Sequence, residues 1–158
     1  MHSFPRFRSR FALVAAFAAG LTFLNTAANG RGESAAEYSK AVRATTILRT
    51  TTDVAGASLA YPTQGEAEVS GLVVELPPGG ETGWHHHTVP CFAYILSGEI
   101  AVTQKDGPTR TFRAGDAFAE LVGLEHNGRT VGTTPVRLVF FAAGVKGQPF
   151  TVKTAAPQ

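Results

Sequence analysis

The stretch PPGGETGWHHHTVPCFAYILSGE, residues 77–99, decides how this chain folds. It places three consecutive histidines between a glycine-rich turn and an apolar run that ends at a Ser-Gly turn. Side chains two positions apart on a strand face the same side, so His85 and His87 share a face while His86 points away. Neutral imidazole is a common metal ligand in proteins, and two imidazoles on one face can hold one ion. The stretch therefore predicts a strand that carries part of a metal site.

A second stretch, GDAFAELVGLEHNGRT at residues 115–130, supplies a distant histidine. The chain has five histidines, of which His2 lies in the N-terminal segment and three lie in the first stretch. His126 is therefore the one candidate for a third imidazole ligand. A metal held by three imidazoles keeps vacant positions for water, dioxygen or a chelating substrate.

Short apolar runs separated by turn residues dominate the rest of the chain. The clearest runs are residues 68–76, 92–96, 100–103, 109–113 and 136–142, with a threonine-rich β-type segment at 44–51. The 17 glycines and 9 prolines supply the turns between them. Strands at this spacing, without helical periodicity after residue 43, predict an antiparallel sandwich or barrel.

Together the two stretches resemble the two sequence motifs of the cupin superfamily. The first motif is matched at Gly79, His85, His87 and Gly98, and the second at Gly115, Gly123 and His126. The resemblance implies an all-β fold, the cupin-type antiparallel β-barrel, also described as a double-stranded β-helix or jelly roll. It also implies a metal site formed by His85, His87 and His126.

The departures from the cupin pattern concern three positions. The family's glutamate ligand falls on Cys91, its proline on Leu121 and its closing asparagine on Thr130. Leu121 and Thr130 are packing positions, whereas Cys91 changes the site. Three interpretations stay open for Cys91: a thiolate ligand to the metal, a protonated residue that only fills space, or a position that points away from a site that binds no metal.

Two acidic residues and one aromatic residue lie close to the histidines in sequence. Glu120 stands alone in an apolar run, where a charged carboxylate is costly unless a metal or a cation pairs with it. We expect it to act as a catalytic carboxylate or as a ligand, whereas Glu125 is the weaker candidate. Trp84, next to His85, is the best aromatic candidate for a pocket wall.

The expected cofactor is one divalent transition metal ion per chain: iron, zinc, copper, nickel or manganese. The motifs contain no cluster of basic residues, so a phosphosugar or nucleotide-sugar substrate is disfavoured, and an apolar pocket suits a small organic molecule.

Cupins include dioxygenases, isomerases, decarboxylases and storage proteins, so the fold leaves the function open. We expect a metal-dependent oxygenase-type enzyme, with a non-catalytic metal- or ligand-binding protein as the alternative.

The N-terminus has the features of an export signal. Basic residues precede an uncharged run at 11–24, which is shorter than the about 20 residues of a membrane span. We expect a Sec-type signal peptide at 1–28, a leader at 29–42, one cupin domain at 43–154 and a tail at 155–158. An uncleaved anchor is the alternative.

The mature protein is then periplasmic or secreted and free of the membrane. The formal net charge of +2 gives no argument for nucleic-acid binding. The expected partners are a small-molecule ligand or substrate and, through exposed barrel edges, a second copy in a homodimer.

Overall fold

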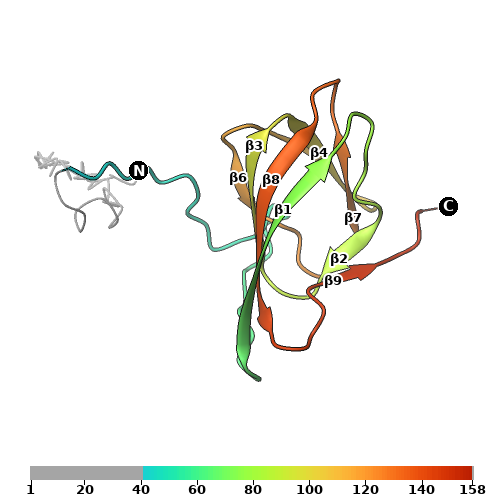
Figure 1. Cartoon of the computed structure of the whole chain (residues 1–158). Helices are drawn as coiled ribbons and strands as arrows, with labels where there is room; N and C mark the ends of the chain where they lie inside the picture. Colours follow the sequence, from blue (N-terminus) through green and yellow to red (C-terminus); the bar gives the residue numbers. More distant parts are fainter. Residues whose placement is uncertain (1–40, 158) are drawn as a thin grey trace, which may run out of the picture. The chain divides into compact units, whose positions relative to one another are not determined.

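The computed structural model of the chain describes residues 41–157, which form nine strands in two antiparallel sheets (Figure 1). The first sheet contains, in spatial order, β1 (Ala67–Leu76), β8 (Val136–Val145), β3 (Cys91–Ser97) and β6 (Ala117–Ala119). The second contains, in spatial order, β5 (Thr109–Arg113), β4 (Glu99–Gln104), β7 (His126–Thr130), β2 (His85–His87) and β9 (Thr151–Lys153). The predicted all-β, cupin-type jelly roll is confirmed. Within this part of the chain, no helix has the length and apolar character of a membrane span.

The core lies between the two sheets and follows from the alternation of side chains along each strand. In β3, Cys91, Ala93 and Ile95 are buried, while the residues between them are partly exposed. This period of two is typical of a strand with one face on a core. β8 repeats the pattern, and Val136, Leu138 and Phe140 pack into the same cluster.

The five clearest runs of the sequence correspond to β1, β3, β4, β5 and β8, with ends that differ by at most a few residues. Three short strands, β6, β7 and β9, were not predicted as separate elements, because three to five residues are too few to show an alternating pattern. The threonine-rich segment at 44–51 forms no strand. All of its residues except Leu48 are exposed, and Ile47 is 57% exposed, so the segment buries little apolar surface that could hold it in a sheet.

The N-terminal arm instead contacts the fold through Asp53. Its carboxylate accepts hydrogen bonds from the N–H groups of Ala55 and Ala57, and the Val54 N–H donates to the Ala119 carbonyl at 3.1 Å. The second carboxylate oxygen of Asp53 accepts a hydrogen bond from the Val122 N–H at 3.3 Å. The arm therefore fixes the segment that connects β6 to β7.

Candidate metal centre

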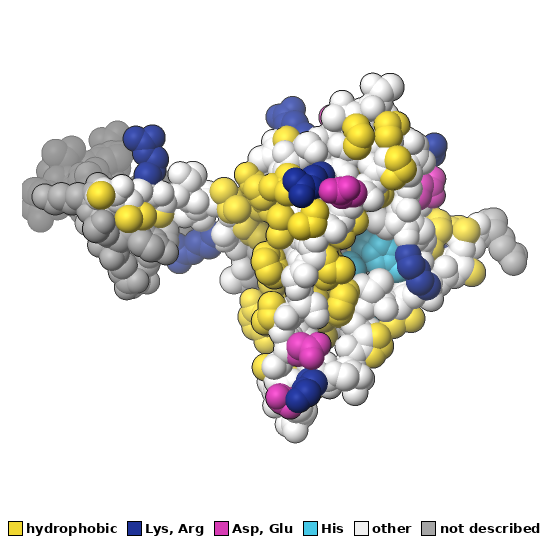
Figure 2. Space-filling view, viewed as in Figure 1, with side chains coloured by type: hydrophobic (Ala, Val, Ile, Leu, Met, Phe, Trp, Pro, Cys, Tyr) yellow, Lys and Arg dark blue, Asp and Glu magenta, His cyan; other side chains and the backbone are white. Residues whose placement is uncertain are grey.

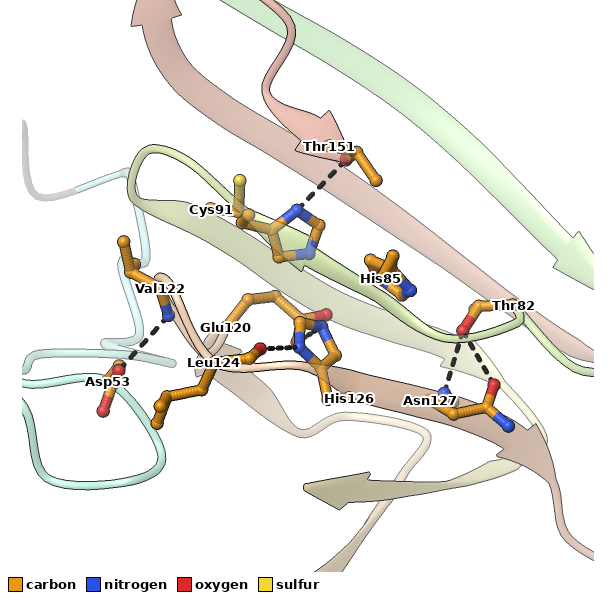
Figure 3. Close-up of polar contacts among 12 residues, drawn as sticks. Asp53, Thr82, His85, Cys91, Glu120, Val122, Leu124, His126, Asn127 and Thr151 are labelled. Carbon is orange, nitrogen blue, oxygen red and sulfur yellow. Dashed lines mark hydrogen bonds and ion pairs between the residues drawn. The ribbon is translucent and has the colours of Figure 1, made fainter. Parts of the chain in front are cut away.

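The two histidine stretches meet because β2 and β7 are neighbours in the second sheet. His85 and His126 are direct partners in their antiparallel register. His87 shares the inner face of β2 with His85, and His86 faces the other way and is only partly buried. The ligand atoms of His85, His87 and His126 all lie within 4.8 Å of one another. The structure thus brings together the three histidines that the spacing singled out (Figure 3).

Backbone carbonyls hold the three imidazole rings in one tautomer. Each Nδ1 lies near a carbonyl oxygen, at 2.7 Å (His85 to Gly83), 3.2 Å (His87 to Phe150) and 2.8 Å (His126 to Leu124). A carbonyl can only accept, so Nδ1 carries the proton in each ring and Nε2 keeps a lone pair. Such a contact is typical of metal-ligating histidines, because it fixes the ring and leaves Nε2 for the metal.

Burial keeps the imidazoles neutral. Desolvation lowers the pKa of His87 to about 3, with further lowering by His126 and His85. Desolvation likewise lowers the pKa of His126 to about 4, and it lowers the pKa of His85 below the usual value. Protons therefore do not compete for the three Nε2 lone pairs near neutral pH.

Glu120 is the acidic residue that the structure places at this cluster. It is 9% exposed, and its Oε2 lies 3.8 Å from His126 Nε2. Both atoms are buried without a hydrogen-bond partner. Desolvation raises the pKa of Glu120 to about 7. Two unpartnered buried acceptors that face each other at this distance are the arrangement that a shared cation would satisfy.

Cys91 does not join the group. Its thiol donates a hydrogen bond to the Val89 carbonyl at 3.3 Å, and in Figure 3 the sulfur points away from His126. Desolvation, with a smaller contribution from Glu120, raises the pKa of Cys91 to about 12, so the thiol keeps its proton. Of the three interpretations of Cys91, this geometry favours the protonated, space-filling residue over the thiolate ligand.

The histidines and Glu120 lie in a cavity of about 260 Å³. Its walls are otherwise mostly apolar, and the lining side chains include Leu72, Val74, Ile100, Val102, Leu138, Phe140 and Phe150. Figure 2 shows the histidine side chains at the bottom of an opening on the surface. The cavity is near the lower end of the usual size of small-molecule sites.

Two further candidates from the sequence lie outside this cavity. Trp84 directly precedes β2 and is not among the residues that line the cavity. The carboxylate of Glu125 binds Lys105 at 2.6 Å. The sequence motifs gave no indication of Thr151 and Lys153, which line the cavity from β9.

A transition metal fits the donors present at this site. Three neutral imidazoles and one carboxylate are ligands for iron, manganese, nickel, copper or zinc, and an N,O set without sulfur does not select for soft ions. The unpartnered Nε2 of His126 and Oε2 of Glu120 are the atoms that an ion would satisfy. The three buried histidines therefore form a group that can hold a metal ion.

Solved structures similar to this chain include several enzymes. The DMSP lyase DddQ from Ruegeria pomeroyi is 26% identical over 54% of this chain and 43% of its own, with a TM-score of 0.48. The oxalate decarboxylase from Lactobacillus farciminis is 21% identical over 54% of this chain and 26% of its own, with a TM-score of 0.47. The chain thus spans less than half the length of either enzyme.

A cupin-like protein from Thermotoga maritima is 16% identical over 62% of this chain and 86% of its own, with a TM-score of 0.49. A search of curated proteins by sequence found no match.

The family model described as a cupin domain matches residues 72–142. That range runs from β1 to β8 and contains both histidine stretches, whose three imidazoles converge at the bottom of the cavity between two antiparallel sheets. The matched range and both motifs thus identify residues 72–142 as a cupin domain.

Proposed function

We propose that the chain is an exported, metal-dependent enzyme of the oxygenase type that acts on a small organic molecule. The observation that carries the proposal is the set of three buried imidazoles, each with Nδ1 bonded to a carbonyl and Nε2 free, at the bottom of an apolar cavity. A divalent transition metal there supplies Lewis acidity and, if it is redox-active, reactivity toward dioxygen. The apolar walls limit the access of water to that position.

The same proposal assigns Glu120 the role that the cupin pattern gives to position 91. The Glu120 N–H donates to the Cys91 carbonyl at 2.8 Å, so the two residues lie side by side on neighbouring chain segments. The carboxylate is then supplied from the segment after β6 instead of from β3. It would hold the metal together with His126, and the small Cys91 side chain leaves room for it.

An exchange of residues tests this assignment. Glu120→Ala should lower the metal content of the purified protein at least severalfold, and Cys91→Glu combined with Glu120→Ala should restore it. Glu125→Ala is the matched control, because its carboxylate pairs with Lys105 outside the cavity. Full metal content in Glu120→Ala would contradict the role of Glu120 and would leave the three histidines sufficient.

Oxygen uptake tests the oxygenase assignment separately. The metal-loaded protein should consume dioxygen with a member of a panel of phenols and thiols, and His126→Ala should abolish that uptake. Stoichiometric metal without uptake on any member of the panel would favour the non-catalytic binding protein instead.

A further inference from the structure

Lys153 is the one lysine or arginine among the described residues that line the cavity. It lies on β9 as the direct register partner of His85 on β2. Its ammonium donates a hydrogen bond to the Thr82 carbonyl oxygen. A β-carbon placed on Gly83 would lie 3.6 Å from the Lys153 nitrogen. The ammonium group therefore lies close to the segment that leads into β2. Figure 2 shows a basic side chain at the edge of the opening that exposes the histidines.

No acidic side chain within residues 41–157 neutralises Lys153. Four other basic residues form ion pairs with glutamates, and they are Lys105, Arg129, Arg137 and Lys146. Among the described residues, the hydrogen-bond partner of Lys153 is a backbone carbonyl, which occupies one of the three N–H donors of the ammonium group. Two donors and a full positive charge therefore remain at the cavity's edge.

We propose that Lys153 binds the carboxylate of the ligand, and that the ligand is a small organic monoanion with an apolar body. The apolar walls accommodate the body, while the carboxylate stays at the edge of the cavity beside the ammonium. One lysine acts as a point charge, which suits a single negative charge. A phosphate carries more negative charge than one ammonium neutralises, and the lining has no arginine to add a bidentate contact. The inference rests on the proposed function, because it takes the cavity to be the substrate site.

The test compares benzoate with benzamide, which have nearly the same shape and differ in charge. Their dissociation constants are measured by calorimetry at low salt on the parent protein, Lys153→Met, Lys153→Arg and the control Lys146→Met. Lys146 is exposed and paired with Glu66, and it does not line the cavity. Metal content is measured on every sample, and the titrations are repeated on metal-free protein.

The parent and Lys146→Met should prefer benzoate by roughly five- to tenfold, as expected for a charge-assisted hydrogen bond at a partly exposed site. Lys153→Met should lose that preference and Lys153→Arg should retain it, with or without metal. If the parent shows no preference, or if the preference survives in Lys153→Met, the inference is overturned. Failure of the proposed function is distinct, because it would appear as a parent protein that binds no metal.

Discussion

At the scale of single residues, Cys91 shows how a motif position can change its chemistry without changing the fold. The side chain is fully buried, and burial raises the pKa of its thiol to about 12. Because the thiolate is the reactive form, we expect the folded protein to react with a thiol-specific disulfide reagent far more slowly than an exposed cysteine at about pH 8. Unfolding in denaturant should restore fast reaction of one thiol per chain. Rapid labelling of the folded protein would contradict the buried, protonated state.

The sequence predicted the histidine cluster but not the behaviour of Cys91. Motif spacing determines which strands carry His85, His87 and His126, and pairing of those strands then brings the imidazoles together. The same spacing fixes only the backbone position of Cys91, whereas the direction of its thiol depends on the nearby Val89 carbonyl. Glu120 could be singled out, because a lone carboxylate in an apolar run must find a partner or stay protonated.

At the scale of elements, the N-terminal arm stabilises the connection between β6 and β7. Asp53 is 5% exposed and accepts hydrogen bonds from three backbone N–H groups, those of Ala55, Ala57 and Val122. We expect Asp53→Ala to lower the free energy of unfolding by roughly 2 kcal/mol, because those donors lose their acceptor. Asp53→Asn keeps one carbonyl oxygen and should cost less. Chemical denaturation measures the free energy of unfolding of both variants, and an unchanged value for Asp53→Ala would contradict the stabilising role of Asp53.

Strand β1 lies at the edge of the first sheet and pairs with β8 alone. Its inner residues Leu72 and Val74 line the cavity, but on the outer face Val69 is 71% exposed and Val73 is 54% exposed. An apolar edge strand of this kind invites pairing with another chain. We expect light scattering to show a homodimer that Val73→Glu weakens, while Val131→Glu on another surface leaves it intact. A monomer for the parent protein at all concentrations would contradict this expectation.

The short strands at the candidate metal centre show what the sequence pattern cannot supply. β2 and β9 have three residues each, yet their pairing determines which residues surround His85. Three residues are too few for a recognisable period, so the position of Lys153 depends on tertiary contacts that no local pattern encodes. The long strands β3 and β8, with clear alternation, could be predicted to within a few residues.

At the scale of the whole molecule, the buried titratable groups make the metal-free protein sensitive to acid. The pKa values of His87 and His126 are lowered to about 3 and about 4. The unfolded chain therefore takes up protons below pH 6.5 that the folded chain does not, and stability is lost as the pH falls. Glu120 acts in the opposite sense: its pKa is raised to about 7, so its stabilising contribution is present at low pH and is lost as the pH rises toward 7.

The imidazoles outnumber the single carboxyl group, so the metal-free protein should lose about 2 kcal/mol between pH 7 and pH 5. Glu120→Gln should make that loss steeper, because it removes the opposing contribution. Thermal unfolding after treatment with a chelator measures this loss of stability in the parent protein and in Glu120→Gln. A melting temperature that is constant or rises over this acid range would contradict the assigned pKa shifts.

We propose that His85, His87 and His126 together hold a metal ion. The most direct test is plasma mass spectrometry of protein purified without added metal or chelator, beside His126→Ala and the control His86→Ala. We expect about one transition metal ion per chain in the parent and in His86→Ala, and little or none in His126→Ala. Equal metal content in all three proteins, or none in the parent even after reconstitution, would contradict the claim.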